Sequence, residues 1–231
     1  MKIDMHTHCL PVSLCAHHQP EELPGFFKKT GIDGFVLTNH CYPRHCDTLS
    51  DDLKEQAEIY IDVYNRCKTA GEKIGIKVFF GCEIKLINEP NKPEFLLYGL
   101  SQEDYISSYP MYNATQKELF DYCNEKDILM YQSHPYRIEQ GYSPADMRYV
   151  HGVEVYNPHL LFDARFDKAF ALSEDNKLLK SSGSDLHIEA QAGLAGMIIP
   201  DDIEDQFMLR DYLKSGEYII FNKDGILCKS K

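Results

Sequence analysis

Short apolar or β-branched runs alternate with amphipathic helical stretches along most of this 231-residue sequence. Strand-type runs lie at 2–7, 34–40, 77–87, 94–100, 128–135, 152–157, 178–187, 196–200 and 218–222. Helical stretches lie at 21–31, 51–74, 115–125, 163–175 and 202–214. Strands separated by helices of this length predict a largely parallel sheet with both faces covered. The run at 94–100 follows a PNKPE turn and is predicted to form a hairpin with 77–87.

The number of these units indicates whether the sheet closes into a barrel. About seven strand-helix units within one chain predict a closed α/β barrel of the TIM type. With 43% apolar residues, the chain can bury one substantial core, so we expect a single domain over 1–231.

Composition excludes several functional classes. A net charge of −12 and a pI near 5.2 argue against broad binding to nucleic acid or to anionic membranes. No apolar run approaches the roughly 18 to 20 residues that span a bilayer, and the N-terminus lacks a signal-peptide core. The eight cysteines include no CxxC pair, which disfavours a zinc ribbon. We therefore expect a soluble, cytoplasmic protein with reduced thiols.

Polar residues of one chemical kind stand at or just past the ends of successive predicted strands. They are His6, His8, His40, Glu83, His134, Asp185 and His187. In a β/α barrel these strand ends converge on one rim, where active sites form. Side chains at i and i+2 of a strand point the same way, so the HxH and DxH pairs each present two ligands to one cavity. In a closed barrel the first and last strands are neighbours, so the two pairs are expected to meet.

Neutral imidazole and carboxylate are ligands of zinc, manganese and iron, and one carboxylate can bridge two ions. We assign the bridging role to Glu83, and we name Glu83, Asp185 and His134 as catalytic candidates. A multinuclear centre lowers the pKa of bound water, so a metal-bound hydroxide can attack phosphorus. Phosphoester hydrolysis is the expected reaction class.

Each element also has a plainer interpretation. Two histidines at i and i+2 often have unrelated partners, His40 can simply cap a strand, and His134 precedes Pro135 in a turn-like setting. Glu83 is harder to dismiss, because a carboxylate inside an apolar strand must find a partner or stay neutral. The joint placement on successive strand ends favours the metal site.

Five motifs resemble those of the PHP family, named for polymerase and histidinol phosphatase. They are MHTH (5–8), TNH (38–40), GCE (81–83), SHP (133–135) and GSDLH (183–187), in the family's order and over nearly the whole chain. The resemblance implies a distorted (β/α)7 barrel that holds two or three divalent ions, and usually phosphoesterase activity on a small phosphorylated substrate.

Residue by residue, the resemblance also implies the ligands. One metal would take His6, His8, Glu83 and Asp185, a second would share Glu83 and add His134, and a third would take His40, His187 and a loop histidine, which is His17 or the adjacent His18.

The chain departs from the family's pattern at two places. Asn39 stands where the family usually has an acid. The family often supplies another histidine between its GxE and HP motifs, but this chain has none from Cys46 through Ser133. A carboxylate such as Glu103 or Asp104, or water, would have to substitute.

Candidates for substrate binding follow the same strand ends. Arg44, Arg137 and Lys85 could grip a phosphate, although loop arginines are often solvated. Asn157 and His159 end another strand and are possible pocket residues. The sequence gives no functional assignment for His45 or His151. Three cysteines beside proposed ligands, Cys9, Cys41 and Cys82, are expected in the core, because adjacent strand residues face opposite ways.

Three functions stay open on the sequence. The first is a metal-dependent phosphoesterase with a small phosphorylated metabolite as substrate. The second is an amidohydrolase-type metallohydrolase, which also begins with HxH on its first barrel strand. The third is a non-catalytic domain that retains part of the metal site, an idea motivated by the missing histidine.

Overall fold

A computed structural model describes residues 1–137, 143–158 and 165–229. The strands are β1 (Lys2–Thr7), β2 (Gly34–Leu37), β3 (His40–Cys41), β4 (Lys77–Lys85), β5 (Glu94–Tyr98), β6 (Leu129–Gln132), β7 (Gly152–Tyr156), β8 (Leu179–Ser182), β9 (Ala195–Ile198), β10 (Ile219–Asn222) and β11 (Gly225–Lys229). The α-helices are α1 (Leu23–Thr30), α2 (Pro43–Cys46), α3 (Leu53–Ile74), α4 (Gln102–Ser108), α5 (Gln116–Glu125), α6 (Phe166–Asp175) and α7 (Gln206–Ser215). Short 3₁₀ turns lie at Met111–Asn113, Met147–Tyr149 and Glu189–Gln191.

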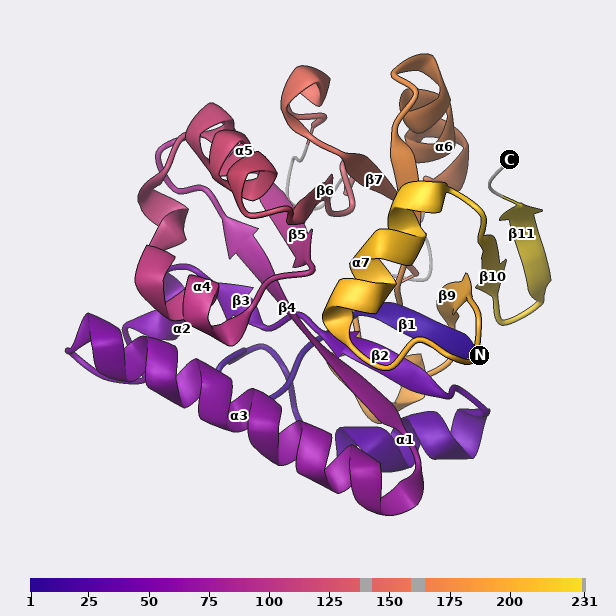
Figure 1. Cartoon of the computed structure of the whole chain (residues 1–231), viewed down its shortest axis with the longest axis horizontal. Helices are drawn as coiled ribbons and strands as arrows, with labels where there is room; N and C mark the ends of the chain where they lie inside the picture. The colour runs from indigo at the N-terminus through magenta and orange to yellow at the C-terminus, as the bar shows by residue number, and fades with distance from the viewer. Residues whose placement is uncertain (138–142, 159–164, 230–231) are drawn as a thin grey trace.

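The strands form one curled sheet in the order β11-β10-β9-β1-β2-β4-β5-β6-β7-β8, with β3 paired to β4 (Figure 1). Two stretches are parallel, β1-β2-β4 and β6-β7-β8. The predicted hairpin of β4 with β5 is confirmed, and β5 is also antiparallel to β6. Antiparallel β9 and β10 follow on the other side of β1. The sheet is therefore mixed, and the prediction of a largely parallel sheet is wrong.

The first strand, β1, and the segment that follows β8 approach each other but do not form a continuous ladder of hydrogen bonds. Within the described residues, β8 pairs with β7, and the segment after β8 reaches β1 through one bridge, Thr7 to Leu186. The structure is thus a mixed α/β fold with a half-barrel sheet, compatible with a TIM-like fold. The number of seven β/α units stays a prediction.

Gly183 permits this approach of the last parallel strand to the first. A Cβ atom at Gly183 would lie 2.4 Å from both the Cβ and the backbone nitrogen of His6. Any larger residue would therefore push the segment 183–187 away from β1.

Apolar side chains pack on both faces of the sheet. Leu209 and Leu213 of α7 join an inner cluster with strand residues such as Ile3 and Phe79. Phe80, the next residue of β4, points the other way into a cluster with Tyr60 of α3, and α1 lies beside α3 on that side (Figure 1). This alternation is what a strand covered on both faces requires.

Local signals fix the ends of the long helix α3. The side chain of Asp52 accepts a hydrogen bond from the backbone N–H of Glu55, and Gly75 ends the helix with a φ of 73°. Both are standard helix-end chemistry.

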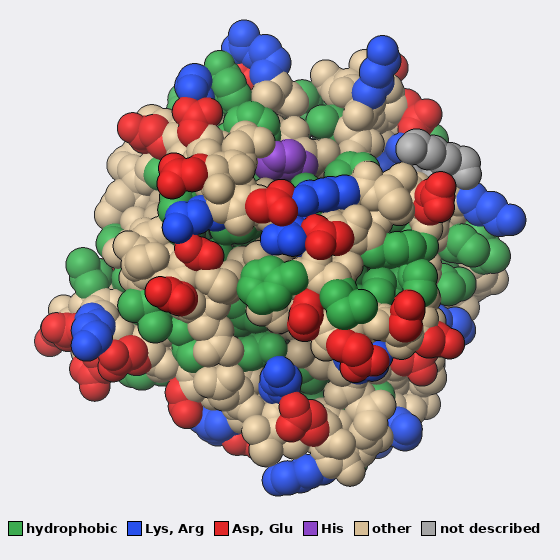
Figure 2. Space-filling model, viewed as in Figure 1, with side chains coloured by type: hydrophobic (Ala, Val, Ile, Leu, Met, Phe, Trp, Pro, Cys, Tyr) green, Lys and Arg blue, Asp and Glu red, His purple; other side chains and the backbone are tan. Residues whose placement is uncertain are grey.

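Charges of both signs are interspersed on the face seen in Figure 2, and no broad basic patch appears there. Among the helices in the described parts of the chain, none has both the length and the apolarity that crossing a membrane requires.

We predict that Gly183→Ala destabilises the protein by about 1–3 kcal/mol, because the new Cβ overpacks against the β1 backbone. Gly25→Ala is the matched control, since a Cβ there meets nothing within 4 Å. Denaturant unfolding measures both. Equal midpoints for the two variants would contradict the close approach at Gly183.

Candidate metal centre

The HxH and DxH pairs lie side by side at the end of β1. The backbone N–H of His8 donates to the carbonyl of Leu186 at 3.0 Å, and the N–H of Leu186 donates to the carbonyl of His6 at 3.3 Å. One ligand atom each from His6, His8 and Asp185 lies within 4.8 Å of the other two. The segments 6–8 and 185–187, which are far apart in sequence, thus form one half of the site.

Glu83 is the hub of the other contacts. Its Oε1 lies 3.3 Å from Nε2 of His6 and 3.0 Å from Nε2 of His134. Its Oε2 lies 2.8 Å from Nδ1 of His40 and 3.5 Å from Nε2 of His8. This one carboxylate, only 1% exposed, therefore faces four imidazoles from different parts of the sheet.

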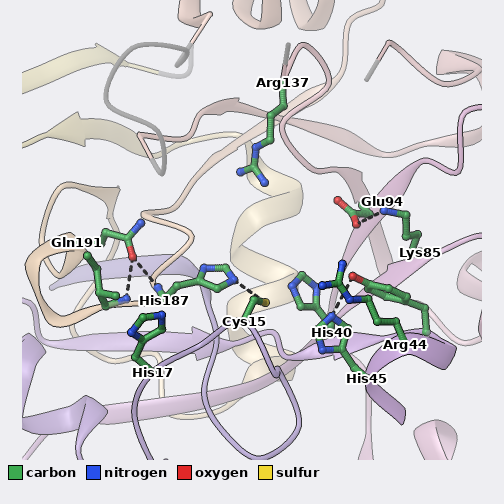
Figure 3. Close-up of a pocket in the computed structure, with 12 residues that line it drawn as sticks. Cys15, His17, His40, Arg44, His45, Lys85, Glu94, Arg137, His187 and Gln191 are labelled. Carbon is green, nitrogen blue, oxygen red and sulfur yellow. Dashed lines mark hydrogen bonds and ion pairs between the residues drawn. The ribbon is translucent and has the colours of Figure 1, made fainter. Parts of the chain in front are cut away.

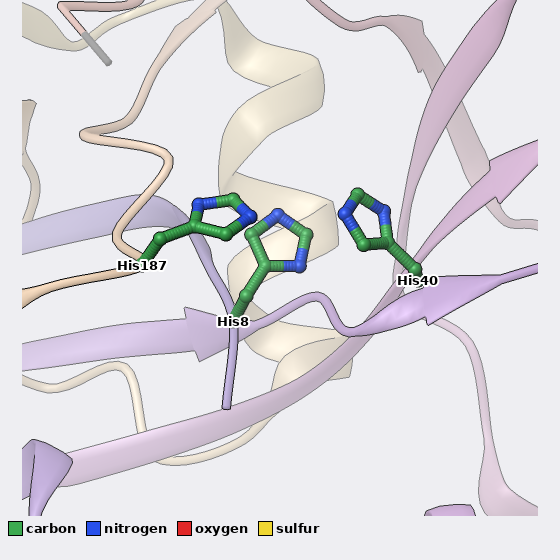
Figure 4. Close-up of side chains that lie close together, drawn as sticks. All are labelled: His8, His40 and His187. Atoms are coloured by element: carbon green, nitrogen blue, oxygen red, sulfur yellow. The ribbon is translucent and has the colours of Figure 1, made fainter. Parts of the chain in front are cut away.

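A third group consists of the rings of His8, His40 and His187 (Figure 4). The His8 ring centroid lies 4.2 Å from that of His40 and 4.6 Å from that of His187. His8 belongs to this group and also to the group of His6, His8 and Asp185, so the two groups share a residue.

Glu154 on β7 orients two of these residues. Its Oε1 lies 2.9 Å from Nδ1 of His6, and its Oε2 accepts the backbone N–H of His134 at 3.0 Å. A carboxylate behind a histidine fixes the tautomer so that the other ring nitrogen faces a metal. The sequence reasoning missed Glu154, although a glutamate within the apolar run GVEVY carries the same signal as Glu83.

Ser13 fixes the tautomer of His8. The Ser13 hydroxyl donates to Oδ1 of Asn39 at 2.9 Å and accepts the backbone N–H of His40 at 3.0 Å. Its one hydrogen is therefore used, and Nδ1 of His8, at 3.2 Å, must be the donor to it. Nε2 of His8 is left as a lone pair that faces Asp185. Asn39 needs only an acceptor oxygen for this purpose, which accounts for its place in the TNH motif.

The backbone at two of these residues is unusual. Asp185 has a φ of 54° and His134 a φ of 27°. Non-glycine residues adopt positive φ at a cost and do so mostly where the surrounding structure imposes it. Buried Asp4 helps to impose it at Asp185, since Oδ1 of Asp4 accepts the N–H groups of both His6 and Ser184.

Electrostatics favour ionised carboxylates with at least one neutral imidazole. Burial alone would raise the pKa of Glu83, but the charge of His6, the hydrogen bond with His134 and the adjacent ring of His40 hold it well below its usual range. The pKa of Asp185 is held low in the same way by His6 and Arg137. Burial and the cationic forms of His40 and His187 keep the pKa of His8 well below its usual range.

The pKa of His6 shows that the site requires positive charge. Burial would lower its pKa, but the charges of Asp185, Glu154 and Glu83 raise it well above the ordinary value. These buried carboxylates therefore demand a positive charge beside Nε2 of His6, either a proton or a cation.

These residues fit a divalent-metal centre. Nε2 of His6, Nε2 of His8 and Oε2 of Glu83 are buried, yet none makes a hydrogen bond of good geometry with any residue in the described ranges. Imidazole nitrogens and carboxylate oxygens that face one another at these distances are the donor set of zinc, manganese and iron sites.

A cavity of about 620 Å³ opens over the third group and holds the candidate substrate residues (Figure 3). Arg137 is buried and points into it; its Nη2 bonds Oδ2 of Asp185, while Oδ1 of Asp185 faces His8 at 3.1 Å. Lys85 pairs with Glu94 at 2.9 Å. Arg44 is exposed at the edge.

Not every predicted ligand reaches the groups. Among the described residues, His17 and His18 do not join any group of converging ligand atoms, and the side chain of His17 is exposed at the cavity. The loop instead places Cys15 there. Its Sγ lies 3.1 Å from Nε2 of His187.

A second buried carboxylate near the ring of His134 is that of Glu94, whose Oε2 lies 3.5 Å from Nε2 of His134. The candidates suggested from sequence do not reach this position. Glu103 is exposed, and Asp104 pairs with Lys126 and bonds Ser101.

The other residues singled out in the sequence have identifiable positions. Asn157 is buried and donates to Oε2 of Glu154 at 2.8 Å, whereas His159 lies outside the described residues. His151 accepts the N–H of Met130 at 3.0 Å, a structural contact. The predicted burial of Cys9, Cys41 and Cys82 in the core is confirmed.

Comparison with families and curated proteins gives no match to this chain. Solved structures do resemble it. A two-domain protein of Bacteroides vulgatus that contains a predicted PHP-like metal-dependent phosphoesterase aligns with a TM-score of 0.73 at 20% identity, over 98% of this chain and 66% of its own. This chain therefore spans just under two thirds of that protein's length.

Two further structures differ in function. An amidohydrolase of Chromobacterium violaceum aligns with a TM-score of 0.58 at 13% identity, over 96% of this chain and 98% of its own. The lesion-specific endonuclease EndoQ of Pyrococcus furiosus aligns with a TM-score of 0.57 at 15% identity, over 95% of this chain and 57% of its own. The chain has the fold of PHP-like proteins, and the family resemblance that its motifs carry is confirmed at the level of the fold.

Proposed function

We propose that this protein is a metal-dependent phosphoesterase of the PHP type that hydrolyses a small phosphorylated metabolite. The observation that carries the proposal is the position of Glu83, a buried carboxylate that faces four imidazoles beside a cavity lined by cationic side chains.

The ligand assignment follows the contacts. His6, His8, Glu83 and Asp185 would hold the first ion, because their facing atoms lie 3.1 to 3.5 Å apart. Glu83 and His134 hold the second. Glu94 is the carboxylate positioned to replace the histidine that is missing between Cys46 and Ser133.

A third ion would take His40 and His187, whose rings lie on either side of Cys15 in Figure 3. Zinc, manganese and iron all suit such histidine and carboxylate ligands.

When bound, the divalent ions would supply the Lewis acidity that lowers the pKa of a water and offsets phosphate charge. The chain's own residues do the rest. Glu83 would be shared by two ions, and Asp185 would hold the first ion with one oxygen while its other oxygen accepts from Arg137. His134 would hold the second ion together with Glu83.

Three cations serve the substrate. Arg137, Lys85 and Arg44 line the cavity and give a phosphate group local positive charge in a chain of net charge −12. The guanidinium of Arg137 has its direction set by Asp185 and Asn157, so it is already oriented before a substrate arrives.

An amidohydrolase is the second candidate, since a structure with that activity shares the fold. The cationic lining favours phosphate over a neutral amide. The acidic surface favours a small substrate over DNA, although an endonuclease also shares the fold. A panel of aryl phosphate, amide and lactone substrates with added metal distinguishes these activities from each other and from a non-catalytic domain.

We predict that Glu83→Gln and Asp185→Asn each lower metal-dependent hydrolysis of an aryl phosphate by about a hundredfold or more, because each removes a charged ligand. Glu103→Gln is the matched control, since Glu103 is exposed on α4. Steady-state assays at saturating metal measure the effect. Full turnover in both ligand variants would refute the assignment.

Metal removal should also destabilise the protein. A ligand that binds only the folded state at 100 times its Kd adds about 2.7 kcal/mol to the free energy of unfolding. We expect a chelator to lower the melting temperature and added zinc or manganese to restore it. The same treatment should shift the melting temperature of Asp185→Asn less than that of the wild type, because this variant loses a ligand of the first ion. A wild-type melting temperature that ignores both additions would contradict the proposed centre.

A further inference from the structure

We propose that the thiolate of Cys15 is a metal ligand of the third site, together with His40 and His187, and that it gives this site a preference for zinc over manganese. The inference deepens the proposed function, because it concerns the same centre. It assigns to a cysteine the position that the family resemblance assigned to His17 or His18.

The position of the sulfur carries the first step. Sγ of Cys15 lies 3.1 Å from Nε2 of His187, and Figure 3 shows Cys15 between the rings of His187 and His40. A tetrahedral zinc with ordinary Zn–S and Zn–N bonds separates the two donor atoms by roughly 3.5 Å. A shift of a few tenths of an ångström would therefore admit the ion.

His187 presents the correct nitrogen to the sulfur. Nδ1 of His187 lies 2.8 Å from the backbone carbonyl of Asp185, so it carries the proton and Nε2 offers its lone pair toward Cys15. Nδ1 of buried His40 makes no hydrogen bond of good geometry within the described part of the chain and lies 2.8 Å from Oε2 of Glu83. His40 thus links the sulfur side of the cavity to the carboxylate hub.

The loop that carries Cys15 is anchored on both sides of the thiol. The N–H of Leu14 donates to Nδ1 of His45 at 2.9 Å, and the N–H of His17 donates to the carbonyl of His187 at 2.9 Å. The thiol is therefore held in place by neighbours of the same cavity.

His45 is the competing ligand, because its ring also lies near Cys15 and His40. Both of its nitrogens are already engaged. Nδ1 accepts from Leu14, so the neutral ring must donate from Nε2 to the hydroxyl of Tyr42, which lies 2.9 Å away. His45 is therefore a positioning residue for the loop and not a ligand.

The chemistry of the donor atom is consistent with ligation. The thiol proton is released to solvent when the metal binds. Thiolate sulfur is a soft donor that suits zinc, whereas manganese prefers oxygen.

Cobalt(II) titration tests this assignment directly. Protein freed of metal by a chelator, then titrated under reducing and oxygen-free conditions, should develop a near-ultraviolet sulfur-to-cobalt charge-transfer band. The band should vanish in Cys15→Ser and persist in His17→Ala. Absence of the band in the wild type, or its persistence in Cys15→Ser, would overturn the proposal.

Alkylation of wild-type protein gives a readout that needs no variant. Metal reconstitution should slow iodoacetamide labelling of Cys15 by roughly tenfold or more, since the metal takes the reactive thiolate. Half-buried Cys228 on β11 is the internal control and should react at an unchanged rate. Equal labelling of Cys15 with and without metal would contradict ligation.

Metal competition tests the stated preference. Cys15→Ser should reduce the preference of the third site for zinc over manganese by roughly tenfold or more. An unchanged preference would refute that part of the proposal. Phosphatase assays are separate: a cobalt–sulfur band without hydrolysis would sink only the proposed function, and hydrolysis without the band only the role of Cys15.

Discussion

The structure depends on how it accommodates buried carboxylates that face several imidazoles. Glu83, Asp185 and Glu154 are each about 1% exposed, and Glu83 alone contacts four histidine rings. A buried ion without a partner costs several kcal/mol, and removing one partner of a buried pair is strongly destabilising. Cations bound between these groups would offset the free-energy cost of burying the carboxylates. The raised pKa of His6 shows the same demand for positive charge.

The fold is arranged to keep this cluster together. Parallel strands deliver His6, Glu83 and Glu154 to one end of the sheet, and α7 packs its leucines into the strand core, behind the cavity as seen in Figure 3. Gly183 and Asp4 then hold the segment with Asp185 against β1. The positive φ at Asp185 is tolerated because its neighbours are fixed on both sides.

The sequence predicted much of this, because strand ends and i, i+2 spacing are local properties. Of the eight proposed ligands, the structure brings seven together and leaves His17 exposed at the cavity. The sheet was harder to predict, since the direction of β9 depends on its pairing with β1, and that of β10 on its pairing with β9, and not on their own residues.

Side-chain contacts that depend on the register of paired strands also could not be predicted from the sequence. Lys85 and Glu94 are opposite each other only because β4 and β5 pair in that register. Glu154 and Ser13 act through hydrogen bonds to histidines distant in sequence or across a turn. Cys15 lies between His187, which follows β8, and His40 of β3 (Figure 3). No spacing rule shows such contacts, because they arise when separate segments fold together.

The metal content of the purified protein tests the central claim most directly. Elemental mass spectrometry on untagged protein prepared without chelator should find roughly two or three equivalents of zinc, manganese or iron per chain. One equivalent or none, even after the protein is soaked with those ions, would contradict a multinuclear centre around Glu83.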